Sequence, residues 1–149
     1  MSLSVQPIDE RAAVAGQLQP GDMKEVAAAG FVAVVNNRPD GEALFGQPRT
    51  TDLRRAAEAA GLVFHDLPFS GTRASPEQVR AMIRLLADSE GSVLAFCNSG
   101  MRSALLWAAA TVASGRPLEE VLRAAERAGQ NLAPARETLA SLAASALQD

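Results

Sequence analysis

The segment that decides the fold is Ser92-Val-Leu-Ala-Phe-Cys-Asn-Ser-Gly-Met-Arg-Ser103, in which an apolar run leads into a short polar turn. The run over residues 92–96 predicts a strand that is buried on both faces of a sheet. The strongly apolar residues 103–113 that follow predict a helix at the centre of the domain. A strand that passes directly into a helix is the repeating unit of α/β proteins.

The same alternation of short apolar runs and helical stretches extends over the rest of the chain. Further strands are predicted over residues 11–15, 31–35 and 62–65. Further helices are predicted over residues 20–29, 52–60, 117–128 and 133–147, with one more that begins at Ser75 and carries an apolar stripe through Leu86. In that helix, Ser75 is the expected N-cap, followed by proline at N1 and glutamine at N3. Together these elements predict a three-layer α/β sandwich with a mostly parallel central sheet.

Length and composition narrow the class of protein. The chain has 149 residues, which is typical of one domain, so we expect residues 1–149 to fold as a unit. One cysteine and one histidine exclude an internal disulfide and a four-ligand zinc site, and we expect no metal and no cofactor. The net charge of −3 gives no reason to expect nucleic-acid binding.

Neither a membrane-spanning run nor a leader is evident. No apolar stretch approaches the roughly 20 residues that cross a bilayer. The first ten residues lack a basic segment followed by an apolar one, so they do not resemble a signal peptide. We therefore expect a cytoplasmic protein with no membrane partner.

Cys97 is the residue that carries chemistry in the deciding segment. A strand-to-helix turn directs backbone N–H groups inward, and the helix N-terminus adds a positive dipole end, so both favour a reactive thiolate. Gly100 permits a positive φ, Arg102 can bind two oxygens of an anion, and Ser103 can donate to the thiolate or cap the helix. A buried structural cysteine is the alternative, but this spacing favours an anion-binding loop.

The Cys97 segment resembles the active-site loop of cysteine-dependent phosphatases and rhodaneses. Val14-Ala-Gly-Gln-Leu-Gln-Pro20 and Val35-Asn-Asn-Arg-Pro-Asp-Gly-Glu42 extend the likeness over nearly the whole chain. They resemble the bacterial beta-lactamase-hydrolase-like phosphatase family, whose members are also described as sulfurtransferases. The resemblance implies the fold of dual-specificity protein phosphatases. Members occur alone or fused to a metal-dependent, persulfide-handling domain, so a separate persulfide-handling enzyme is a candidate partner.

Two reactions compete for this loop. Phosphatase loops of this kind usually place five residues between cysteine and arginine, whereas four stand here, as in rhodaneses. A phosphatase also needs a carboxylic acid to protonate its alkoxide leaving group. Residues 69–73, where the resemblance places that acid, contain none. Asp66 is the nearest candidate general acid, although it lies close to the end of the predicted strand.

Sulfur transfer requires neither the five-residue spacing nor the general acid, and it is the main prediction. The Cys97 thiolate would take sulfane sulfur from thiosulfate or a persulfide, and an acceptor thiol would then attack the Cys97 persulfide. In this reading, the catalytic residues are Cys97, Arg102 and Ser103. One alternative is a cysteine-dependent phosphatase that acts on a phosphate ester through a phosphocysteine. The other is a catalytically weak anion-binding or partner-docking module.

The small anionic donor or phosphate ester is expected to bind at the loop itself. The predicted substrate-binding residues there are Asn98, Ser99, Gly100 and Met101. Arg38 joins them because it follows the predicted strand 31–35 and should emerge at the same sheet edge as the cysteine. A solvated turn arginine is the alternative for Arg38. Relatives often carry arginine and threonine where Asn98 and Met101 stand, and the loss of that arginine weakens anion attraction.

Overall fold

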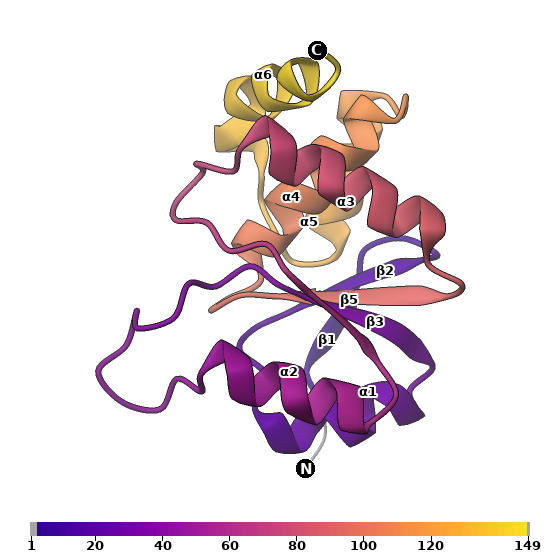
Figure 1. Ribbon diagram of the computed structural model, residues 1–149. Helices are drawn as coiled ribbons and strands as arrows, with labels where there is room; N and C mark the ends of the chain where they lie inside the picture. The colour runs from indigo at the N-terminus through magenta and orange to yellow at the C-terminus, as the bar shows by residue number, and fades with distance from the viewer. Residues whose placement is uncertain (1–2, 149) are drawn as a thin grey trace.

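A five-stranded sheet lies between two layers of helices in the computed structural model, which describes residues 3–148 (Figure 1). The spatial order of the strands is β1-β2-β5-β3-β4, and the strands β2, β5, β3 and β4 run parallel to one another. Only β1 is antiparallel, and it pairs with β2. The bounds are β1 Val5–Pro7, β2 Ala12–Ala15, β3 Phe31–Asn36, β4 Val63–Asp66 and β5 Ser92–Phe96. The predicted three-layer sandwich with a mostly parallel sheet is confirmed.

The helices divide unequally between the two faces of the sheet. The helices α1 and α2 cover one face, and α3 to α6 cover the other (Figure 1). The α-helices are α1 Met23–Ala28, α2 Thr50–Ala59, α3 Pro76–Asp88, α4 Met101–Ala113, α5 Leu118–Arg127 and α6 Arg136–Ala146. Two short 3-10 segments, η1 Pro20–Asp22 and η2 Ala133–Ala135, precede α1 and α6. No helix within residues 3–148 is long and apolar enough to cross a bilayer.

The central strands are continuous apolar runs because both of their faces are buried. Ala33 and Val35 of β3 belong to the core under α3 to α6. Val34 of β3, together with Leu94 and Phe96 of β5, belongs to the core under α1 and α2. Successive side chains of a strand point to opposite faces, so a strand with helices on both sides needs an apolar residue at every position.

The helix α4 lies in the middle of its layer, as its composition predicts. Residues 103–111 are all buried, and α4 packs against α3, α5 and α6. The indole nitrogen of Trp107 donates a hydrogen bond to Asp9 Oδ2 over 3.2 Å, which ties the helix to the segment between β1 and β2. The helix that follows the cysteine is therefore held on every side.

Besides the 3-10 segments with which the predicted helices 20–29 and 133–147 begin, two features of the fold differ from the sequence prediction. The strand β1 was not predicted, because three partly exposed residues at a sheet edge leave no apolar pattern to read. The helix α4 begins at Met101 instead of Ser103, since Gly100 with φ +95° turns the chain directly into the helix. Arg102 consequently lies within the first turn of α4.

Replacing Ser75 with alanine should destabilise the domain by about 1 kcal/mol, because Ser75 caps α3. Ser75 Oγ accepts a hydrogen bond from Gln78 N over 3.1 Å, and Gln78 Oε1 accepts one from Ser75 N over 3.0 Å. Urea denaturation followed by circular dichroism measures the free energy of unfolding. Ser141→Ala, at an exposed position inside α6, is the control and should not lower it. Equal effects of the two substitutions would contradict the capping role.

Candidate functional site

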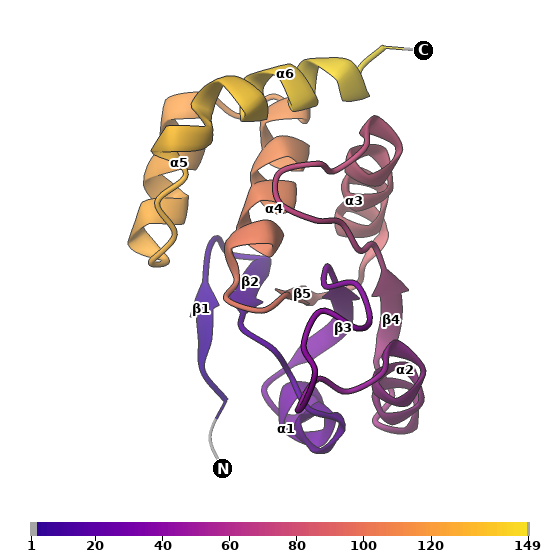
Figure 2. The ribbon, with the colours of Figure 1, turned by 90° about the vertical axis from the view of Figure 1, so that its left-hand side faces the viewer.

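Three loops converge at the edge where the parallel strands end. They follow β3, β4 and β5 and cover residues 37–49, 67–75 and 97–100, which we call the edge loops (Figure 2). The carboxyl ends of parallel strands lie at one edge of a sheet, where α/β proteins bind their ligands. The segments predicted to carry chemistry are therefore brought together by the topology.

Cys97 lies at the floor of this edge and is fully buried. Its Sγ accepts a hydrogen bond from the backbone N–H of Gly100 over 3.0 Å. Gly100 is the N-cap of α4, and a Cβ added there would lie 2.8 Å from Gln130 Nε2. Gln130 Nε2 in turn donates to Ser99 O over 3.2 Å. The positive φ of +95° favours glycine at this position, as predicted, whereas the flexible side chain of Gln130 could move away from a Cβ.

Ser103 ties α4 to the loop after β3. Its hydroxyl donates to Asn37 Oδ1 over 2.7 Å, and Asn37 Nδ2 donates to Leu67 O over 2.9 Å. A serine hydroxyl has one proton to donate, so Ser103 does not donate to the Cys97 thiol in this arrangement. The predicted capping role of Ser103 is also wrong, because Gly100 occupies the N-cap position. Asn37 thus joins the loop after β3 to α4 and to the loop after β4.

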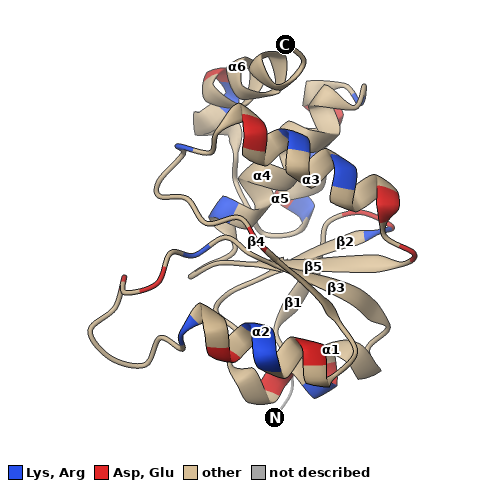
Figure 3. Cartoon of the chain, in the orientation of Figure 1, with Lys and Arg blue, Asp and Glu red and all other residues tan. Residues whose placement is uncertain are grey.

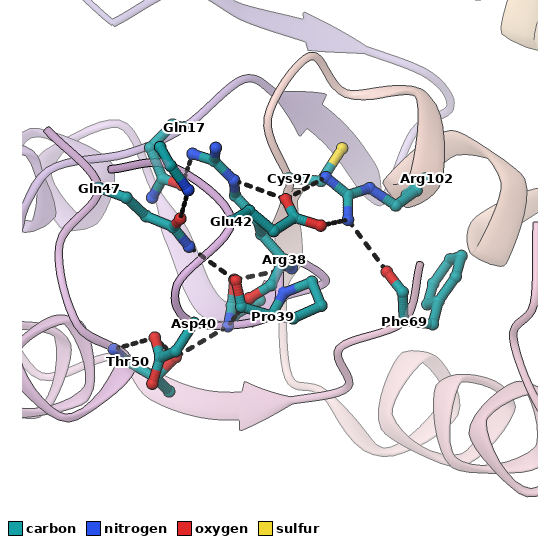
Figure 4. A network of polar contacts seen from close by, with 12 residues as sticks. Gln17, Arg38, Pro39, Asp40, Glu42, Gln47, Thr50, Phe69, Cys97 and Arg102 are labelled. Atoms are coloured by element: carbon teal, nitrogen blue, oxygen red, sulfur yellow. Dashed lines mark hydrogen bonds and ion pairs between the residues drawn. The ribbon is translucent and has the colours of Figure 1, made fainter. Parts of the chain in front are cut away.

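Arg102 forms a two-pronged ion pair with Glu42 (Figure 4). Arg102 Nη1 donates to Glu42 Oε2 over 2.7 Å, and Nη2 donates to Glu42 Oε1 over 2.9 Å. Nη1 also donates to Phe69 O over 3.0 Å. These hydrogen bonds to Glu42 are the largest cause of the raised pKa of Arg102, to which the neighbouring Cys97 side chain also contributes. The guanidinium therefore stands beside the sulfur with its position fixed from the side.

Glu42 also binds Arg38. Arg38 Nε donates to Glu42 Oε1 over 2.9 Å, and Arg38 Nη1 donates to Gln17 Oε1 over 2.9 Å. The hydrogen bonds from Arg102, and then those from Arg38, lower the pKa of Glu42 to about 2 against the opposing effect of burial. Glu42 is thus ionised at neutral pH. Arg38 is only 9% exposed, so the solvated turn arginine is wrong and Arg38 lies at the site.

Asp66, the predicted candidate general acid, is not brought to this cluster. Its Oδ1 accepts a hydrogen bond from Asn36 Nδ2 over 2.9 Å at the end of β4. It lines a groove along the free edge of β4 together with Arg84 and Asp88, and that groove does not include Cys97. The prediction that Asp66 lies too close to the strand end to reach the reacting group is consistent with this position.

The remaining predicted binding residues lie on the outer side of the Cys97 loop. Asn98, Ser99 and Met101 are exposed, and Asn98 O accepts a hydrogen bond from the backbone N–H of Gln17 over 3.2 Å. Within residues 3–148, no group of three or more His, Cys, Asp or Glu residues could hold a metal ion. The Cys97 thiol, the Gly100 N–H and the Arg102 guanidinium therefore lie together, and amide and guanidinium N–H groups are of the kind that bind a tetrahedral anion.

Sequence reasoning missed Glu42 and Gln130. Glu42 ended the segment Val35–Glu42 that carried the family resemblance, but no role was given to it. A carboxylate in a loop expected at the same edge as an arginine was the available signal. Gln130 had no signal, because its contact with the cysteine loop depends on how the turn after α5 packs.

The chain matches known proteins over most of its length. Residues 5–114 match the model of the family described as "Beta-lactamase hydrolase-like protein, phosphatase-like domain". A Beta-lactamase hydrolase-like protein of Agrobacterium fabrum (strain C58) is 38% identical over 109 residues. This alignment covers 73% of the chain but only 25% of that relative, so the chain spans about a quarter of its length.

Solved structures agree with this match. A candidate phosphatase of Neisseria meningitidis Z2491 (nma1982) superposes with a TM-score of 0.81 and 32% identity, covering 95% of this chain and 99% of that one. The active form of Tk-PTP superposes with a TM-score of 0.74 and 25% identity, covering 95% and 96%. On the extent of these matches, and in agreement with the resemblance noted in its motifs, the chain belongs to the family of Beta-lactamase hydrolase-like phosphatase-like domains.

Proposed function

We propose that this chain is a cysteine-dependent phosphomonoester hydrolase with Cys97 as its nucleophile. The observation that carries the proposal is the cradle at the edge of the sheet, where Gly100 N–H points at the Cys97 sulfur and the Arg102 guanidinium stands beside it. The phosphatase-like family and its solved neighbours support this reading over the sulfur transfer that the sequence alone favoured. No comparison supports sulfur transfer.

In the proposed reaction, the Cys97 thiolate attacks the phosphorus atom of a bound monoester. The new S–P bond forms as the ester P–O bond breaks, and the leaving oxygen departs as the alkoxide or aryloxide and takes up a proton from solvent water. Water then attacks the phosphocysteine, which releases inorganic phosphate and restores the thiolate. The loop amides of residues 98–102 and the guanidinium bind the non-reacting oxygens of the phosphoryl group.

Arg102 can bind a phosphoryl group without releasing Glu42. A guanidinium has five N–H donors. Both Nη1 protons are used, by Glu42 and Phe69 O, and one Nη2 proton is used by Glu42. The second Nη2 proton and the Nε proton remain, and two adjacent N–H groups match two oxygens of a phosphate. In this proposal Glu42 is a positioning residue, because it holds the guanidinium from the side away from the substrate.

Among residues 3–148, no carboxylic acid is placed to protonate the leaving group, since Asp40 Oδ1 accepts two hydrogen bonds from Thr50. Glu42 is ionised at neutral pH, and Asp66 hydrogen-bonds Asn36 in a groove that does not include Cys97. General acid catalysis typically contributes a factor of about 10² to 10⁴. We therefore expect the hydrolase to prefer monoesters of acidic alcohols, such as aryl phosphates, over alkyl phosphates.

Hydrolysis of an aryl phosphate by the purified chain tests the proposal. We expect phosphate release that Cys97→Ser abolishes and that Arg102→Lys lowers by about a hundredfold, since one planar pair of donors is lost. A radiolabelled phosphocysteine should be trapped on the wild-type chain after acid quenching. Asp66→Asn is the matched control and should change the rate by no more than about twofold.

Sulfur transfer is the second candidate, because four residues instead of five separate Cys97 from Arg102. The distinguishing measurement is the intact mass after incubation with thiosulfate. Gain of one sulfur atom, removed by cyanide and absent in Cys97→Ser, without phosphate release from any ester would overturn the phosphatase proposal in favour of sulfur transfer. Absence of both activities would leave an anion-binding module.

Glu42→Gln should lower kcat/KM about tenfold or more, because a charge-assisted hydrogen-bond pair that fixes Arg102 is weakened. We expect weaker binding of the anion as well as slower turnover, so KM should rise. A kinetic series against pH gives the second readout. Between pH 5 and 8 the ratio of wild-type to variant kcat/KM should stay constant, since Glu42 is ionised over this whole range. A ratio that changes with a midpoint near neutral pH would instead make Glu42 an acid catalyst.

The same ion pair predicts how stability depends on pH. The pKa of Glu42 is about 2 in the folded chain and 4.5 in the unfolded reference, so the carboxylate stabilises the fold above pH 4.5. This contribution is lost as the pH falls from 4.5 toward 2. The difference in unfolding free energy between wild type and Glu42→Gln should be about 1 kcal/mol at pH 7 and should shrink below pH 4.5. Glu77→Gln, on the exposed pair with Arg80, is the control and should show little difference at any pH.

A further inference from the structure

The loop after β3 ends in an apolar tip that covers nothing. Leu44 and Phe45 are adjacent, and their exposed fractions are 93% and 90%. The loop that carries them projects from the carboxyl edge of the sheet (Figures 1 and 2). Met101, at the start of α4 and on the same edge, is 54% exposed. Single exposed apolar residues are ordinary, but two neighbouring large ones on a projecting loop mark a contact site.

The base of this tip is fixed to the body of the loop. Gln47 Oε1 accepts a hydrogen bond from Ala43 N over 3.0 Å, and Gln47 Nε2 donates to Pro39 O over 2.7 Å (Figure 4). Gln47 therefore bridges the two sides of the loop below the apolar pair. Glu42, directly below, is held by two arginines. The position of the tip relative to Arg102 is therefore fixed.

The net charge of the edge around the tip is positive, whereas the net charge of the whole chain is negative. The chain has 17 acidic and 14 basic residues, whereas residues 37–49, 67–75 and 97–102 contain four arginines and two carboxylates. The arginines are Arg38, Arg49, Arg73 and Arg102, and the carboxylates are Asp40 and Glu42. The edge that bears the apolar tip is therefore locally positive.

Both carboxylates of this edge are already bound, and two of the arginines are not. Asp40 Oδ1 accepts from Thr50 N and Oγ1 over 2.9 and 2.8 Å, and Glu42 is held by its two arginines. Arg49 and Arg73 are exposed, and neither has an ion pair among the described residues. Figure 3 shows basic positions, in blue, on the loops at this edge. Asp40 is exposed and keeps its charge, because Thr50 donates only neutral hydrogen bonds to it, but the four arginines outnumber the two carboxylates, so the net charge of this edge is positive.

We propose that the Leu44–Phe45 tip docks this edge of the protein on the surface of a bilayer that contains anionic lipids. Leu44 lies two residues beyond Glu42, whose carboxylate binds Arg102, and two extended residues span about 7 Å. Apolar side chains of interfacial segments sink about 5–10 Å into a bilayer. A tip inserted to that depth brings the arginines of the edge to the level of the lipid phosphates.

The shape of the tip favours a bilayer over a protein groove. The hollow beside it is lined by loop residues on either side of the pair, and neither Leu44 nor Phe45 lines it. The two side chains therefore form no recess for a partner's side chain. They project into solvent, and a protein partner would have to supply a matching groove, whereas a bilayer deforms to take them. Two side chains and a few arginines give weak binding, which high salt should reverse.

This proposal departs from the expectation of no membrane partner. That expectation rested on the absence of a spanning run and of a leader in the sequence. Docking at the interface requires neither, because it depends on a small apolar insertion and on attraction to anionic headgroups. It is also independent of the reaction at Cys97.

Co-sedimentation of the full chain with vesicles tests the proposal. Vesicles of phosphatidylcholine alone are compared with vesicles to which phosphatidylglycerol is added. We expect binding to the anionic vesicles that is weaker on phosphatidylcholine and is reduced by high salt. The double variant Leu44→Ser/Phe45→Ser should lower the partition coefficient on anionic vesicles by about tenfold or more.

Leu147→Ser supplies the matched control. Leu147 is 67% exposed at the end of α6, away from the 37–49 loop (Figure 1), and its loss should leave vesicle binding unchanged. Thermal unfolding of both variants checks that they fold. Failure of the wild-type chain to bind anionic vesicles, or equal binding by the double variant, would overturn the proposal. So would a double variant that raises only the KM for a phosphopeptide, since the tip would then serve a protein partner.

Discussion

The turn at Gly100 is the constraint on which the rest of the molecule depends. It takes the chain from the central strand β5 into the central helix α4 within four residues, and it does so with a left-handed backbone. Because β5 and α4 are both buried, neither can shift to relieve a larger residue at the turn. The Cys97 sulfur and the guanidinium of Arg102 are consequently set side by side by the packing of the core.

The second determinant is electrostatic. Glu42 lies 60 residues before Arg102 in the chain, yet the two side chains form an ion pair over 2.7 Å, which neutralises part of the charge of the arginine. An ionised carboxylate beside an anion-binding site costs attraction for the substrate. In return, the side chain of Arg102 is held in one orientation, and two of its donors stay free for a ligand. A fixed weaker charge serves an anion site better than a mobile stronger one, because less side-chain entropy is lost on binding.

Much of the fold was predictable from the sequence, because the buried strands and amphipathic helices have distinct periodicities. The runs at 31–35 and 92–96 are strands, and the capping sequence at Ser75 begins a helix. The strand β1 was not predicted, because an edge strand needs no apolar pattern. The carboxyl ends of parallel strands lie at one edge of the sheet. This rule correctly placed three residues at the site, namely Cys97, Arg102 and Arg38.

What the sequence could not supply were the side-chain partners. Ser103 was expected at the thiol or as a cap and instead binds Asn37, while Glu42 was overlooked because its partner is remote in sequence. The sequence and the comparisons also favour different reactions. Loop length and the missing acid favoured sulfur transfer, whereas the family and its solved neighbours favour phosphatase chemistry.

The side chain of Gln47 bridges the loop after β3 and divides it into two parts. The two parts differ in how far their length and sequence can change. Residues 38–42 must keep their length, since inserting one residue there would pull the Glu42 carboxylate off Arg102. Residues 44–46 lie outside the bridge, Leu44 and Phe45 are almost fully exposed, and Gly46 O accepts a hydrogen bond only from the exposed Gln19, so changes of length or sequence there need not move the carboxylate. The same loop can therefore keep its chemistry unchanged while its outer end is adapted to new surroundings.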